Sequence, residues 1–205
     1  MAHPGSGIVI DIYGQIYFTD TGKGVWKIDT NGHLTYLPAS RFHWMTIDAA
    51  GHFATSPKNF GEYFERVTLQ NAKPALIMCS DFPLVVANDG NIYYADTRHG
   101  SAKIIRRTPA GKESVLTSDK IFEFISGIAV GPDGSLYITE AGNGNGNTIR
   151  KITLNGTMSI VATFVGKIGL SGRPFPANAS GRSIDATGAC QVRMDVWARL
   201  PHAAF

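Results

Sequence analysis

Apolar and polar residues alternate in short runs along most of this 205-residue chain, and one run recurs four times. The four copies each end in a glycine and keep one register: GIVIDIYG (7–14), WMTIDAAG (44–51), PLVVANDG (83–90) and GIAVGPDG (127–134). In every copy the second and fourth positions are apolar, which is the period of two expected of a β-strand. Each copy therefore predicts the first strand of a repeated unit, followed by a turn at the glycine.

Further strands are expected after each turn. In three units the next run is apolar on both faces, at 16–18, 92–94 and 136–138, and such a strand has to be covered on both sides. A third run opens at Val25, Phe64, Ile104 and Ile149 and leads to turns at 30–33, 70–73, 109–112 and 154–157. A fourth run follows at 34–37, 75–78, 113–116 and 158–161. Each unit thus predicts a four-stranded antiparallel meander.

The spacing of the units predicts the fold class. The turn glycines Gly14, Gly51, Gly90 and Gly134 lie 37, 39 and 44 residues apart, close to the roughly 40–50 residues of one propeller blade. We expect an all-β protein, a β-propeller of about four four-stranded blades at 5–41, 42–80, 81–120 and 121–166. A Gly/Pro-rich linker and an incomplete or irregular C-terminal segment are expected at 167–205.

Composition agrees with many short strands and narrows the function classes. The chain has 23 glycines, 10 prolines and only 17% charged residues, more turn formers than helix interiors tolerate. A net charge of +3 is too small to indicate a nucleic-acid partner. Two cysteines exclude a disulfide framework, and no zinc spacing is present. With no long apolar run and no leader sequence, we expect no membrane partner, and the compartment stays open.

Two stretches carry a resemblance to known propellers. GIAVGPDGSLYITEAGNGNGNTIRKITLNGTMSIVA resembles an NHL repeat, and GQIYFTDTGKGVWKIDTNGHLTYL is similar to blades of the SMP-30/gluconolactonase-like family of six-bladed, TolB-like propellers. The resemblance covers about residues 5–165 and implies the fold, while the family's members include lactonases, lyases and proteins that only bind. It therefore implies a binding or scaffold module that recognises a protein or small ligand through its loop face. The alternative is a divalent-metal-dependent, lactonase-like hydrolase or lyase.

The chain departs from that family in three places. The second unit has Ala54 where the others have an aromatic residue, and Pro57 where the others have an acid. The opening HPGSGIVID lacks the Glu that holds the metal in gluconolactonase-like relatives. Four units are fewer than six, so we expect a fragment of a longer propeller, an unusually small propeller, or a chain that self-associates to complete one.

Three acids at one repeated position are the main candidate ligand-binding residues. Asp20, Asp96 and Glu140 each follow the second run of their unit, and a propeller would bring equivalent positions toward one end of its channel. Converging carboxylates suit a hard cation such as calcium, or general acid and base catalysis. The structural alternative is that each carboxylate accepts backbone N–H groups and fixes the loop that follows. No cofactor is assigned, and a metal at these acids is only a weak expectation.

Other candidates are fewer. Trp44 replaces the small residue found at Gly7 and Gly127, so it either packs between blades or lines the channel. Asn143 lies in the loop GNGNGN (142–147), where the units differ most in length and where propellers carry function. One third-strand position is basic in all four units: Lys27, Arg66, Arg106 and Lys151. Such a column either follows phosphates or, as outer-strand residues do, covers apolar neighbours with its long stems.

Overall fold

The computed structural model describes residues 4–69, 74–97, 102–117, 122, 124–141 and 147–164. All regular structure in these ranges is β-strand, arranged as the four blades of a β-propeller, so the expected fold class is confirmed. Residues 167–205, the expected linker and C-terminal segment, lie outside the described ranges. Within the described residues, no helix is both long and apolar enough to span a membrane.

Three blades are the expected antiparallel meanders. Blade 1 contains β1 (Pro4–Ile10), β2 (Ile16–Asp20), β3 (Gly24–Ile28) and β4 (Leu34–Leu37). Blade 3 contains β8 (Leu84–Val86), β9 (Ile92–Asp96), β10 (Lys103–Arg107) and β11 (Glu113–Thr117). Blade 4 contains β12 (Ile125–Val130), β13 (Leu136–Ala141), β14 (Asn147–Ile152) and β15 (Met158–Phe164). In each of these blades, strands that are consecutive in sequence lie side by side.

The repeated glycines close the hairpins of these three blades. At Gly14, Gly90 and Gly134 the backbone φ is between 77° and 80°, and the glycine N–H donates to the carbonyl three residues earlier. The residue that carries this carbonyl also donates the strand-closing bond through its own N–H, as in Ala87 N–H to Asn91 O at 2.9 Å. This geometry is a type I turn followed by a left-handed residue, a position that favours glycine. The recurrent glycine is therefore a structural requirement of the turn.

Blade 2 departs from the meander predicted by the sequence. It contains β5 (Trp44–Asp48), β6 (Phe64–Thr68) and β7 (Ala75–Cys79), in the spatial order β5-β7-β6. The last run of the unit, expected at the outer edge, thus pairs directly with the first. All five residues of β7 are buried, and a strand that is apolar on both faces belongs in the middle of a sheet.

The segment that should have been the second strand lies instead outside β6. A single bridge joins Asn59 to Glu65, and the Arg66 N–H donates to the Lys58 carbonyl at 2.7 Å. Pro57 precedes this contact, and proline is confined to sheet edges because it has no N–H to donate. The degenerate second unit therefore remains a blade of the propeller, with its last apolar run in the middle of the sheet and the proline-containing segment at the outer edge.

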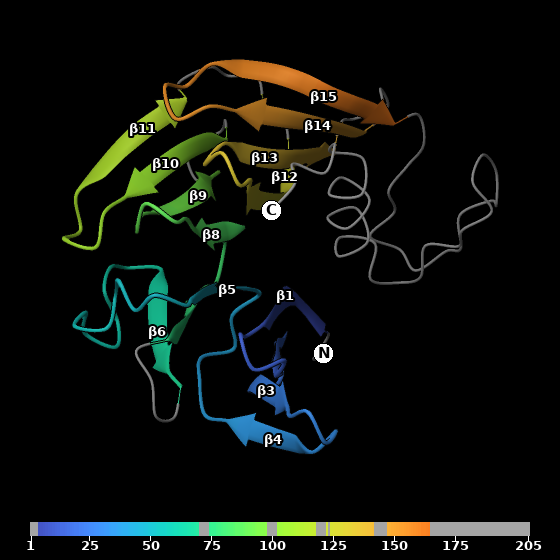
Figure 1. Cartoon of the computed structure of the whole chain (residues 1–205), viewed down its shortest axis with the longest axis vertical. Helices are drawn as coiled ribbons and strands as arrows, with labels where there is room; N and C mark the ends of the chain where they lie inside the picture. The colour runs from blue at the N-terminus through green and yellow to red at the C-terminus, as the bar shows by residue number, and fades with distance from the viewer. Residues whose placement is uncertain are drawn as a thin grey trace.

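The blades follow one another along an arc and bury three apolar clusters between them. In Figure 1 the arc runs from β1, β3 and β4 at the bottom, through β5 and β6 and then β8 to β11, to β12–β15 at the top. The innermost strands pack in the order β1, β5, β8, β12. Tyr17 and Leu76 lie between blades 1 and 2, Phe82 and Tyr94 between blades 2 and 3, and Ile104 and Ile138 between blades 3 and 4.

The central position of β7 gives a testable prediction. Ile77 is fully buried between blades 2 and 3, so Ile77→Ala should lower the free energy of unfolding by about 2–5 kcal/mol. Urea denaturation measures this loss. Val115→Ala, on the outer strand of blade 3 and 53% exposed, is the control and should change stability by at most about 0.5 kcal/mol. A cost as small for Ile77 as for Val115 would mean that β7 is an outer strand.

Candidate functional site

The ends of the second strands lie at one end of the propeller, here called the loop end. β2 finishes at Asp20, β9 at Asp96, and β13 reaches Glu140 just before its own end. The connectors between blades at 38–43 and 80–83 lie at the same end, because β5 and β8 start there opposite the ends of β7 and β9. The candidate acids are thus placed at one end of the fold, as their spacing predicts.

Each acid has its own environment there. The Asp20 carboxylate accepts the Gly22 N–H at 2.7 Å and so fixes the turn into β3. Glu140 is buried and accepts the Arg150 Nε–H at 2.8 Å, an ion pair between β13 and β14. Asp96 is also buried. The partner of Asp20 is that of the structural alternative, a backbone amide, whereas Glu140 pairs with a side chain of the neighbouring strand.

The register places Asp96 and Glu140 between blades. Asp96 shares a sheet face with Tyr94, which packs against blade 2, and Glu140 shares a face with Ile138, which packs against blade 3. The described residues contain no group of three or more His, Cys, Asp or Glu side chains that could hold a metal ion. The arrangement brings the acids to one end without joining them in one coordination shell. A cation at Asp20, Asp96 and Glu140 therefore stays a prediction.

The remaining candidates are placed as follows. Trp44 opens β5 and packs against the cluster between blades 2 and 3, the blade-packing role weighed for it from the sequence. Asn143 lies outside the described residues.

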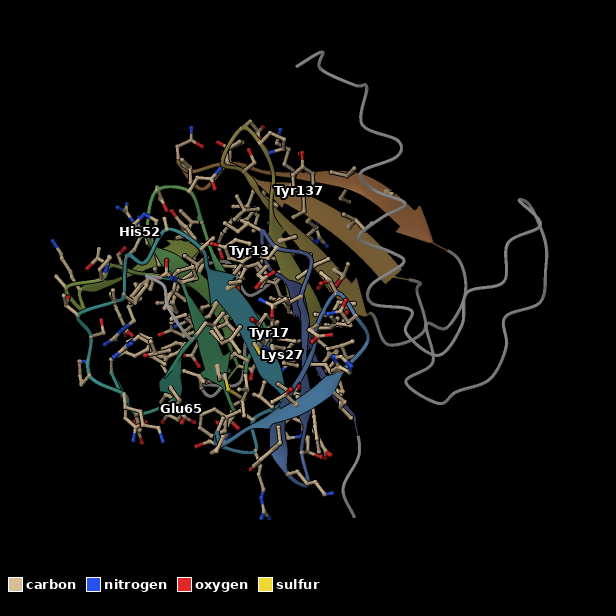
Figure 2. All side chains as sticks on the ribbon, turned by 60° about the horizontal axis from the view of Figure 1, so that its bottom comes forward. Tyr13, Tyr17, Lys27, His52, Glu65 and Tyr137 are labelled. Atoms are coloured by element: carbon tan, nitrogen blue, oxygen red, sulfur yellow. The ribbon has the colours of Figure 1, made fainter. Side chains whose placement is uncertain are left out.

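The basic column belongs to a network that spans strands within each blade. Lys151 Nζ lies 2.6 Å from the Asp133 carboxylate and 5.8 Å from the centre of the Tyr137 ring. In blade 2, Arg66 instead donates to the Ser56 carbonyl at 2.9 Å and to Thr68 at 2.6 Å. Figure 2 labels Tyr17 and Lys27, which are directly paired across β2 and β3. Lys151 thus covers a tyrosine and binds a turn group, and Lys27 lies opposite a tyrosine, as expected of outer-strand residues that shield apolar neighbours.

The turn aspartates are the residues that the sequence reasoning missed. The Asp11 carboxylate accepts the Tyr13 and Gln15 N–H groups, both at 2.9 Å, and the Tyr17 hydroxyl at 3.2 Å. Asp89 repeats the pattern with the Asn91 N–H at 3.0 Å and the Tyr93 hydroxyl at 2.8 Å. The signal in the sequence is an Asp within three residues before each turn glycine and, in blades 1, 3 and 4, a Tyr three residues after it. Each aspartate ties its turn to its second strand.

These contacts shift the pKa values of both partners. Burial would raise the pKa of the Asp89 carboxyl, but hydrogen bonds from Asn91 and Tyr93, with the nearby Arg106, hold it below its ordinary value. Burial first, and then the aspartate, raise the pKa of Tyr93 to about 12, and the Tyr17 pKa rises to about 12 in the same way. A protonated tyrosine facing an ionised aspartate is the stable state, because ionising both would place two negative charges together.

Asp48 and His52 form the version of this turn found in blade 2. The buried Asp48 carboxylate accepts the His52 N–H at 3.0 Å and the Phe53 N–H at 2.8 Å, and His52 Nδ1 lies 3.1 Å from it. In blade 1, Asp11 receives the backbone and side chain of Gln15 at the same spacing. A His and an Asp in contact also occur in catalytic dyads. Here, however, the hydrogen bonds of Asp48 and His52 repeat those of Asp11 and Gln15 in blade 1, so the pair holds the turn in place.

The tyrosine pKa predicts how stability changes in alkali. Because the Tyr93 pKa is about 12 when folded and 10.0 ordinarily, its contribution is complete below pH 10 and is lost as pH rises toward 12. Tyr93→Phe should lower the free energy of unfolding by about 1 kcal/mol at neutral pH. It should also flatten the decline of stability between pH 10 and 12.

Urea unfolding at several pH values measures both effects. Tyr13→Phe, at a 66% exposed turn position, is the matched control and should leave both unchanged. An alkaline slope in Tyr93→Phe as steep as in the parent chain would contradict the assigned role. Tyr17 retains the same contribution in the variant, so the slope should be reduced and not abolished.

The chain is similar in sequence to known proteins, but these similarities do not assign it to a protein family. No family model matches the chain. It is 29% identical to mouse teneurin-3 over 171 residues and 30% identical to chicken teneurin-1 over 167 residues, with 76% of this chain covered each time. It spans about 6% of the length of each of these relatives.

Among solved structures, a catalytically inactive virginiamycin B lyase of Staphylococcus aureus with quinupristin overlaps 77% of this chain and 54% of its own, at 18% identity and a TM-score of 0.49. A streptogramin B lyase overlaps 83% of this chain and 43% of its own, at 19% identity and a TM-score of 0.31. The chain is therefore a propeller by its own topology, and its assignment to the NHL or SMP-30 families stays a prediction.

Proposed function

We propose that this chain is a non-catalytic β-propeller module that binds a protein or a polar small ligand through its loop end. The observation that carries the proposal is that the repeated charged residues bind one another or neighbouring tyrosines within a blade. The Glu140–Arg150 and Asp133–Lys151 pairs and the Asp89–Tyr93 contact each hold strands of one blade together. Charged groups that are paired in this way stabilise the scaffold. This role supports the proposal that ligands are recognised by the loops that the scaffold carries.

The loop end offers polar contacts from several connectors. Lys23, Arg41, His43 and Asp81 are exposed there and come from three different loops. His43 also connects two of them, because its Nδ1 lies 3.1 Å from the Ser80 carbonyl oxygen. A surface with both signs of charge, placed on rigid strands, suits hydrogen-bonded recognition of a protein surface or a polar ligand.

The metal-dependent, lactonase-like alternative rests on the three acids of the loop end. The Arg150 Nε–H already donates to one oxygen of the Glu140 carboxylate at 2.8 Å, so a cation bound there would lie close to the Arg150 guanidinium. The two positive charges would repel each other. This repulsion favours the binding module over the enzyme. Self-association to complete the propeller, also expected from the sequence, would use sheet faces and not these loops.

A thermal melt with calcium, magnesium, manganese or zinc tests the alternative. For a binding module we expect no metal-specific rise of Tm. A cation present at about 100 times its Kd would instead stabilise the fold by about 2.7 kcal/mol. The quantity to compare is the metal-induced change in Tm, because Glu140→Ala should lower Tm by itself. A rise lost in Asp96→Ala and kept in the exposed control Asp81→Ala would favour the enzyme.

The binding surface can be mapped directly. A library of short peptides and polar fragments, added to the isotope-labelled chain, should shift amide resonances of residues 20–24, 38–43 and 80–83. The opposite turns at 29–33, 108–112 and 153–157 are the internal control, because they are also accessible to solvent but lie at the other end. Shifts confined to those turns, or absent from both ends, would count against recognition at the loop end.

A further inference from the structure

Within the part of the chain that the structure describes, blade 1 leaves one apolar sheet face without a neighbour. The pairing register places eight apolar side chains on this face: Ile8, Ile10, Ile16, Phe18, Trp26, Ile28, Leu34 and Tyr36. None of the eight is buried, and Ile10 is 62% exposed and Leu34 55% exposed. The other face of the same sheet packs against blade 2 through Tyr17 and Val25. A contiguous apolar face of this kind marks an interaction surface.

The same positions are covered in the later blades. Ile8 is 46% exposed, whereas its equivalents in the repeat, Leu84 and Ile128, are 3% and 1% exposed. Leu84 belongs to the cluster between blades 2 and 3, and Ile128 to the cluster between blades 3 and 4. In each case the preceding blade provides the cover. The uncovered face of blade 1 therefore corresponds to the face of blade 3 that packs against blade 2, and to the face of blade 4 that packs against blade 3.

The complementary half is present at the other end of the arc. Blade 4 presents Tyr137 and Thr139 away from blade 3, at the positions by which Tyr17 and Thr19 of blade 1 meet blade 2. Tyr17 and Thr19 are buried, at 3% and 1% exposure, whereas Tyr137 and Thr139 are only half-buried. Ile149, beside them, is already buried. Figure 2 labels Tyr17 on blade 1 and Tyr137 on blade 4.

These two halves do not meet within one chain. The innermost strands pack as β1 on β5, β5 on β8 and β8 on β12, and the described residues show no comparable packing of β12 on β1. Accordingly, three apolar clusters join the four blades of the described part, one for each consecutive pair.

We propose that the uncovered face of blade 1 binds the Tyr137 face of blade 4 in a second copy of this chain. The occupant is a second copy because the Tyr137 face of blade 4 is equivalent to the Tyr17 and Tyr93 faces, which already cover the next blade within the chain. Two copies joined in this way at both ends would close a ring of eight blades, the upper end of the usual range. The interface is head-to-tail, so it closes only through rotational symmetry. This assembly is separate from the loop-end function, because it uses sheet faces and not loops.

Sedimentation of the full chain at micromolar to hundreds of micromolar concentration tests the proposal. We expect a reversible dimer, and longer head-to-tail chains would support the same interface without ring closure. Ile10→Glu should weaken association by about tenfold or more, because it places a charge within the apolar face. Ile12→Glu is the matched control, since Ile12 is two residues away, lies in the turn and is 77% exposed. A chain that remains monomeric at all concentrations would overturn the proposal.

A mixing experiment distinguishes a head-to-tail interface from a symmetric one. Thr139→Arg should block the blade 4 half as Ile10→Glu blocks the blade 1 half, so each variant alone should be monomeric. A mixture of the two should form a one-to-one dimer through the single junction that remains intact. Failure of the mixture to associate, or dimers that persist in either single variant, would overturn the head-to-tail arrangement. Circular dichroism of each variant confirms that the strands are retained.

Discussion

The structure depends on one constraint: each sheet has two apolar faces, and both have to be covered by neighbouring sheets. A single blade cannot bury both of its faces, so stability comes from the contact of one blade with the next. The aromatic cluster between blades 2 and 3, where the ring centres of Phe82 and Tyr94 lie 5.6 Å apart, is one example of this contact. The turns, the ion pairs and the tyrosines all act to keep each sheet flat against its neighbour.

This constraint explains why blade 2 tolerates a degenerate sequence. A strand in the middle of a sheet has to be buried on both faces, whatever its order along the chain. The apolar run 75–79 meets this requirement and therefore occupies the middle of blade 2. The proline-containing segment then lies outside β6, where a missing N–H costs no ladder hydrogen bond. The propeller continues because the faces that blade 2 presents to blades 1 and 3 stay apolar.

The repeated polar groups serve the same end. Asp11 and Asp89 hold a turn and a tyrosine together, and each of these tyrosines then packs between blades. Lys151 does the equivalent work in blade 4, where its Nζ lies between the Asp133 carboxylate and the Tyr137 ring. Polar residues that recur in every blade are therefore part of the scaffold. In the proposed function, recognition falls to residues that do not recur, such as Arg41 and His43.

The sequence by itself determined the strands, the turns and the propeller, because alternation and turn glycines are local properties of the chain. It also placed Asp20, Asp96 and Glu140 at one end, since equivalent positions of a repeat lie at equivalent ends. Tertiary structure decided the strand order of blade 2, the pairing of Glu140 with Arg150, and the uncovered face of blade 1. These features depend on which surfaces meet, and such contacts join residues that no local pattern of the chain relates to one another.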